Sequence, residues 1–191
     1  MPVSSEPPDV AKLLHLIFLS TSWGMQIWVT FVSGRFVWLV MGSCLTRHTY
    51  GFIWSKLFPY YLHIGSACAF FNLTIFAMYH PSELLTFVAA LQITVFFVCV
   101  AVAALNAEWF GRTTSDILAD MHQIERSYGL GQEIGFFTSK SYRKLRESDP
   151  AYRKMSRQLI IYHALSSLCN LCCIACNGWS LCYLAAHLSA L

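Results

Sequence analysis

Histidines lie inside long apolar stretches of this sequence, and they are the side chains there that are best suited to chemistry. His63 and His163 each lie roughly one helical turn or more within a stretch that has no formal charge. Two facing imidazoles at one depth are a ligand set for haem iron or a transition metal. Polar side chains at membrane depth also pair with one another without a metal. Haem b or metal binding and hydrogen bonding between helices are therefore both open for this pair, whereas the lone His15 near the opposite end favours hydrogen bonding.

A run of cysteines near the end of the chain has the spacing of a metal-binding motif, Cys169-x-x-Cys172-Cys173-x-x-Cys176. On a helix with about 100° per residue, its four sulfurs share one face. We expect that face to point away from the row formed by Asn170 and Asn177. Since cysteine in apolar surroundings behaves as a small hydrophobe, these thiols should face lipid or a neighbouring subunit of a homo-oligomer. The eight cysteines predict no disulfide framework.

Each long apolar stretch has one stripe of polar residues at helical spacing. If the four stripes point inward, they form either hydrogen bonds between helices or a polar cavity that holds a ligand. A small channel or transporter lined by the stripes is a third interpretation, and the sequence does not decide among them. The candidate cavity residues are His15, Gln26, Lys56, His63, Gln92, Asn106, His163, Ser167 and Asn170.

The elements that position these side chains are membrane-crossing helices. The 191 residues are 56% hydrophobic and only 12% charged, whereas a soluble domain is about 25% charged. Four stretches reach the roughly 20 apolar residues that a helix needs to cross a bilayer, and backbone groups in lipid must be bonded within the segment. The predicted fold is an all-α integral membrane four-helix bundle. Its predicted parts are a leader 1–12, a membrane domain 13–182 with spans 13–34, 57–79, 84–107 and 159–182, a helical loop 108–158 between the third and fourth spans, and a tail 183–191.

The distribution of Lys and Arg predicts the orientation. Twelve of the thirteen lie in the two connections 35–56 and 108–158, and the other one is Lys12. Since cytosolic connections are rich in Lys and Arg, we expect both connections in the cytosol and both termini on the luminal or exterior side. The connection 108–158 should also attract anionic lipid headgroups. It holds nine basic and seven acidic residues, a mixture that does not indicate nucleic-acid binding.

Helix signals are also present in the cytosolic loop. Ser115 can cap a helix that ends at Gly129, and Asp149 followed by Pro150 predicts the start of a helix that continues into the fourth span. The first of these helices should dock an apolar stripe onto the ends of the bundle. The stripe consists of Ile117, Met121, Ile124 and Tyr128.

The spans contain no Asp or Glu. A paired-carboxylate active site is therefore excluded within them, and a proton- or sodium-coupled transporter of the usual kind is disfavoured. The sequence has no P-loop and no dinucleotide-binding fingerprint. We therefore expect a protein without an identifiable reaction.

Five stretches are specific enough to indicate a family, namely Trp23–Gly34, Arg47–Gly51, Ser55–Pro59, Leu145–Pro150 and Tyr162–Asn170. Together they resemble the vertebrate transmembrane protein 205 family, and the similarity extends over essentially the whole chain. The resemblance implies a four-pass protein of secretory-pathway or plasma membranes that is linked to cellular resistance to cisplatin, through trafficking or drug export. More distantly, the layout is similar to that of some haem-associated bacterial membrane families.

Overall fold

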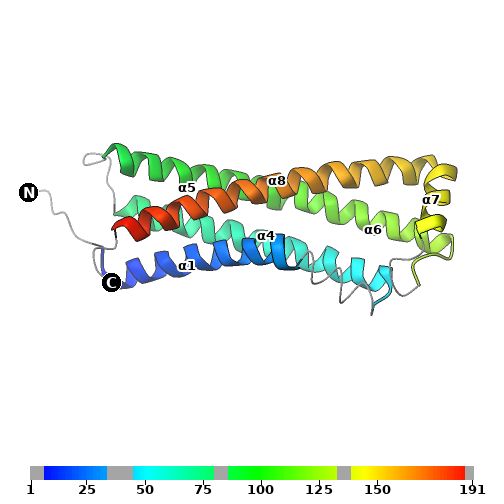
Figure 1. Ribbon diagram of the computed structural model, residues 1–191, viewed down its shortest axis with the longest axis horizontal. Helices are drawn as coiled ribbons and strands as arrows, with labels where there is room; N and C mark the ends of the chain where they lie inside the picture. Colours follow the sequence, from blue (N-terminus) through cyan, green and yellow to red (C-terminus); the bar gives the residue numbers. More distant parts are fainter. Residues whose placement is uncertain (1–6, 34–44, 80–85, 133–138, 188–191) are drawn as a thin grey trace, which may run out of the picture.

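The computed structural model describes residues 7–33, 45–79, 86–132 and 139–187, and nearly all of these are helical. Four helices lie side by side along the long axis of the molecule (Figure 1): α1 (Asp9–Ile27), α4 (Arg47–Met78), α5 (Phe87–Leu105) and α8 (Pro150–His187). Both α1 and α5 contact α4 and α8, so that α4 and α8 lie diagonally opposite each other. The predicted all-α class is confirmed for the described residues.

The third long helix continues without a break into the loop that follows it. After α5, the π-helical turn η4 (Asn106–Gly111) leads directly into α6 (Arg112–Ser127). The prediction of a separate helix capped by Ser115 is therefore wrong. Gly111 does not end the helix; it stays helical and packs against the Leu62 side chain, where a Cβ atom would not fit.

Two predicted helix boundaries are confirmed, the end of α6 at Gly129 and the start of α8 after Asp149. Gly129 has a φ of +68°, a conformation that glycine adopts without strain. Asp149 Oδ1 accepts the backbone N–H of Ala151 at 2.8 Å and of Tyr152 at 3.2 Å, which caps α8. The short helix α7 (Ser139–Ser148) precedes this cap and lies across the end of the bundle (Figure 1).

Three of the described helical stretches are long and apolar enough to cross a membrane: Arg47–Met78, Phe87–Ser127 and Pro150–Ala186. Each extends beyond its predicted span at one end or at both; α4 begins at Arg47 rather than at residue 57. The first helix does not reach this hydropathy. It begins at Asp9, earlier than predicted, and continues after Ile27 as the π-helical turn η1 (Trp28–Ser33).

The outer surface of the molecule carries many large apolar side chains, and polar side chains lie buried among apolar ones inside it. Phe97 and Leu168 are 63% and 64% exposed, whereas Gln92 and Asn177 are each 1% exposed. A soluble protein shows the opposite distribution, and only hydrocarbon around the helices makes this one favourable. The surface pattern agrees with the membrane environment that the composition predicts.

Candidate functional site

The last helix places a row of polar side chains at the centre of the bundle. Asn170, Asn177 and Ser180 all lie on the side of α8 that faces the other helices, and each forms a side-chain hydrogen bond with another helix. Asparagine and serine at these positions satisfy each other's groups in a region without water. We call this row and its partners the interior network.

Asn177 is the most highly connected member of the interior network. Its Nδ2 donates to Gln26 Oε1 at 3.0 Å and to Ser22 Oγ at 3.1 Å, both on α1. Its Oδ1 accepts a bond from Cys99 Sγ of α5 at 3.5 Å. One amide group thus joins three helices.

A second junction lies about two turns away on α8. Tyr61 of α4 donates its hydroxyl to Asn170 Oδ1 at 2.8 Å, and Asn170 Nδ2 donates to Thr30 Oγ1 at 2.5 Å. Asn170 also borders a small pocket together with Gln26 and Asn106. The free space in it is about 10 Å³ for the centre of a water molecule, which is enough for about one water.

Two more candidate residues pair within the interior. Gln92 Nε2 donates to Ser180 Oγ at 2.6 Å, and Asn106 Nδ2 donates to the backbone carbonyl of Ser166 at 3.1 Å. The amide oxygens of Gln92 and Asn106 have no partner among the described residues. They are the acceptors that one or two internal waters would satisfy.

His15 is buried near the start of α1, at the opposite end of the bundle from His63 and His163. Its ring lies edge-on to Phe96, with 5.4 Å between the ring centroids, and tilted against Phe76 at 6.1 Å. These contacts place His15 among aromatic side chains, away from His63 and His163.

Four of the candidate residues do not face the interior. Lys56, His63, His163 and Ser167 are exposed. Both nitrogens of the His63 ring are already engaged, Nδ1 with the Pro59 carbonyl at 2.7 Å and Nε2 with Glu108 at 3.1 Å. The structure therefore brings His63 to Glu108 and not to His163.

The position of His163 follows from the part of α8 that is buried. Ser166 and Cys173 are 2% exposed, and at about 100° per residue both lie on the opposite side of Asn170 from His163. The stripe of α8 therefore points inward at Asn170 and Asn177 but not at His163 or Ser167.

The prediction for the cysteine run is wrong for Cys173. Its thiol packs against Ala69, Cys99 and Ala103 in the core and lies 3.7 Å from the Cys99 carbonyl. The angular argument shows why, because Cys173 lies only about 60° from Asn170 around the helix. Cys169, the first of the run, is half-buried.

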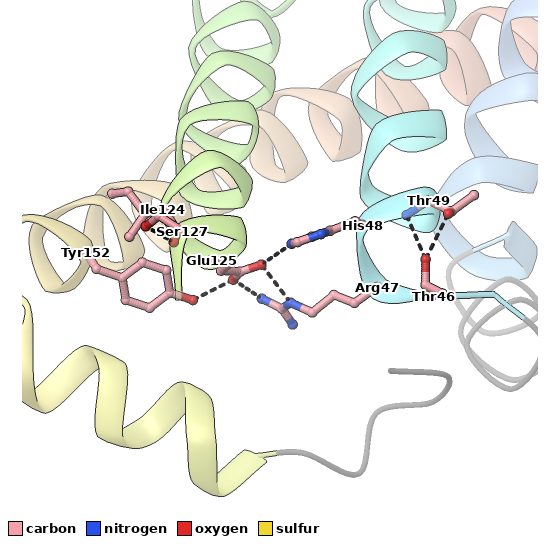
Figure 2. Close-up of polar contacts among 8 residues, drawn as sticks. All are labelled: Thr46, Arg47, His48, Thr49, Ile124, Glu125, Ser127 and Tyr152. Atoms are coloured by element: carbon pink, nitrogen blue, oxygen red, sulfur yellow. Dashed lines mark hydrogen bonds and ion pairs between the residues drawn. The ribbon is translucent and has the colours of Figure 1, made fainter. Parts of the chain in front are cut away.

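A second polar cluster, the Glu125 cluster, lies beyond the apolar stretches, where α4, α6 and α8 meet. The Glu125 carboxylate is 0% exposed. Its Oε1 accepts bonds from Arg47 Nη2 at 3.1 Å and from the Tyr152 hydroxyl at 2.6 Å, and its Oε2 pairs with His48 Nε2 at 3.2 Å (Figure 2). Arg47 Nε lies 3.4 Å from Oε2, which makes the Arg47 contact bidentate.

Local signals position each member of this cluster. Thr46 caps α4, accepting the Thr49 backbone N–H at 3.3 Å (Figure 2), so Arg47 and His48 occupy its first turn. On α8, Tyr152 lies three residues after the Asp149 cap, in the first turn. The two α4 side chains and the α8 hydroxyl thereby meet one carboxylate of α6.

Two glycines make room for the imidazole rings around Glu125. The His122 ring lies against Gly51, and the His48 ring lies against Gly131, whose φ is +97°. A Cβ atom at either glycine would collide with the ring. The two rings are 5.0 Å apart between centroids.

Burial and charge shift the pKa values in this cluster. Burial alone raises the pKa of the Glu125 carboxyl, but the hydrogen bonds from Arg47 and Tyr152 and the Arg47 charge lower it by more, so the pKa lies below its ordinary value. Burial also lowers the pKa of His122 to about 4. Glu125 is therefore charged and His122 neutral at pH 7.

Sequence reasoning missed the Glu125 cluster, although one signal was present. Glu125 directly follows Ile124 and lies four residues after Met121, so a carboxylate sits on the apolar stripe of the loop helix. A charge on a buried face requires partners. Neither Arg47 nor Tyr152 is near it in sequence, so the partners were not identifiable from spacing.

Comparisons with known proteins identify relatives of this chain. A family model described as a domain of unknown function, DUF4149, matches residues 17–123. Over 192 aligned residues, which cover all of both chains, the sequence is 40% identical to Transmembrane protein 205 of Danio rerio. No solved structure matches the chain.

Removing the Tyr152 hydroxyl tests the contribution of the Glu125 cluster to stability. Because a hydrogen bond to a charged group contributes about 1.5–3 kcal/mol, Tyr152→Phe should lower the free energy of unfolding in detergent micelles by that amount. Tyr128→Phe is the matched control, since Tyr128 is 58% exposed. Equal effects of the two substitutions would contradict the assigned role of Tyr152.

The low pKa of His122 predicts a pH dependence of stability. Between the unfolded value of 6.5 and the folded value of about 4, the unfolded chain binds a proton that the folded chain does not. The melting temperature should therefore fall as the pH drops from 7.5 to 5, and His122→Gln should show a smaller fall. A wild-type melting temperature that is constant over this range would refute the prediction.

Proposed function

This chain belongs to the transmembrane protein 205 family, and from that premise we propose that it is a four-pass membrane protein that contributes to cisplatin resistance without catalysing a reaction. It is an integral multi-pass membrane protein. Its contribution is to membrane trafficking or drug export in the secretory pathway or the plasma membrane.

In this proposal, α1 crosses the membrane in addition to the three more apolar stretches. The polar residues that lower its hydropathy are directed into the bundle: Ser22 is 0% and Gln26 4% exposed. Its outer face is apolar, with Leu13 56% and Ile17 46% exposed. A helix with this distribution is suited to lie at the edge of a bundle in lipid.

The interior network is the observation that carries the non-enzymatic proposal. Its amide and hydroxyl groups hydrogen-bond one another across helices, which fixes the register of the bundle. The pocket beside Asn170 has room for about one water, whereas sites for drug-sized ligands measure about 300–1,000 Å³. In a membrane scaffold, these residues hold the helices in register.

The proposed orientation places both termini outside the cytosol. It rests on the excess of Lys and Arg in connections 35–56 and 108–158. An epitope tag after Leu191 should be accessible to antibody on intact cells or in intact luminal compartments, and a tag between α6 and α7 should require permeabilisation of the cytosolic side. The reverse pattern would overturn the orientation.

Cellular platinum content tests the functional proposal. Cells that express the chain should lose platinum faster after cisplatin washout than cells with an empty vector, as measured by mass spectrometry. Asn177→Leu should reduce this effect at equal abundance, because it leaves Ser22 and Gln26 buried without their partner. Leu168→Ala, a change on the exposed face of the same helix, is the control. Identical platinum retention with and without the chain would refute the proposal.

A further inference from the structure

An open apolar groove lies between α1 with its extension η1 and α4. Figure 1 shows these two helices side by side. The groove measures about 530 Å³. It is lined by Gly24, Met25, Trp28 and Val29 on one side and by Leu57, Tyr60, Tyr61 and Ile64 on the other.

The groove opens on the outer surface of the apolar part of the bundle. Trp28 is 59%, Leu57 61% and Tyr60 70% exposed. These side chains leave a recess between them at Gly24, where a Cβ atom would have no other atom within 4 Å. In a bilayer, hydrocarbon is what contacts such a surface.

One end of the groove has a positive charge. Lys56 is exposed and precedes Tyr60 by one helical turn, on the same face of α4. Its ammonium group is directed away from the groove, toward the start of α4, with Nζ 5.9 Å from the centroid of the Phe52 ring. Lys56 forms no ion pair with the described carboxylates.

We propose that this groove binds one anionic phospholipid, with an acyl chain between Trp28 and Tyr60 and the headgroup phosphate on Lys56. The distance along α4 from Lys56 to Ile64 is about 12 Å at 1.5 Å per residue, so the charged and apolar parts lie at different depths, as they do in a phospholipid. A sterol would place only a hydroxyl group beside Lys56 and would leave its charge unpaired.

The proposal rests on the proposed orientation, which places Lys56 at the cytosolic leaflet, where anionic lipids are concentrated. Lipid binding itself is measured on purified protein, and orientation and platinum content are measured in cells. A failure of the lipid-binding proposal is therefore distinguishable from a failure of the proposed orientation or function.

The test uses full-length protein in nanodiscs that contain phosphatidylcholine alone or phosphatidylcholine with phosphatidylserine. After transfer to detergent, native mass spectrometry counts the lipids that stay bound. We expect one retained phosphatidylserine per chain. Lys56→Gln should weaken its retention about fivefold, the effect of removing one charge near a membrane surface, and Lys56→Arg should preserve it.

A second pair of variants tests the apolar part of the groove. Gly24→Leu fills the recess, and Gly24→Ala adds only one methyl group there. The leucine variant should lose retained lipid, and the alanine variant should keep it. Because both substitutions favour helix formation over glycine, loss of folding is not the expected cause of a difference between them.

Three outcomes would overturn the proposal. Equal retention of phosphatidylserine and phosphatidylcholine would remove the role of charge. Unchanged retention in both Lys56→Gln and Gly24→Leu would place the lipid elsewhere. Displacement of phosphatidylserine by cholesterol at equal molar amounts would identify a sterol as the occupant.

Discussion

The structure depends on one constraint: polar side chains within the apolar helices are costly unless they find partners inside the bundle, because hydrocarbon covers its outside. Asn177 satisfies it by joining Gln26, Ser22 and Cys99 at one level. Such bonds contribute about 0.6 kcal/mol each on average in membrane proteins. Their larger effect is on specificity, since sliding α8 by one residue would leave several amides unpaired in a medium without water.

Beyond the apolar stretches, a charged cluster rather than neutral side chains joins the helices. Glu125 binds Arg47 of α4 and Tyr152 of α8, and these hydrogen bonds and the Arg47 charge offset the cost of burying the Glu125 carboxylate. The interior network holds the helices in register within the apolar part of the bundle, and the Glu125 cluster joins their extensions beyond it. Along the same helices, neutral polar side chains form the contacts in the apolar part, and charged side chains form them beyond it.

Much of the fold was predictable because it follows from local rules. Apolar length predicted the long helices, Gly129 predicted the end of α6, and the Asp149 cap predicted the start of α8. The continuous helix through Ser115 was not predictable, because η4 and the contact of Gly111 with Leu62 depend on packing against α4. Periodicity likewise placed Asn177 inward correctly and His163 incorrectly, since a stripe does not show where neighbouring helices stop covering it.

The candidate site shows the same division between local and non-local information. Asn170 and Gln26 were identifiable because polar side chains in an apolar stretch are few, and each is costly unless it is paired inside the bundle. The Glu125 cluster was not, because its partners are separated from Glu125 by 78 residues at Arg47 and 27 at Tyr152. A carboxylate on an apolar stripe indicates that it needs partners, but it does not indicate which residues they are. For a chain of this kind, the sequence therefore predicts which side chains face inward within the membrane better than it predicts how the helices meet outside it.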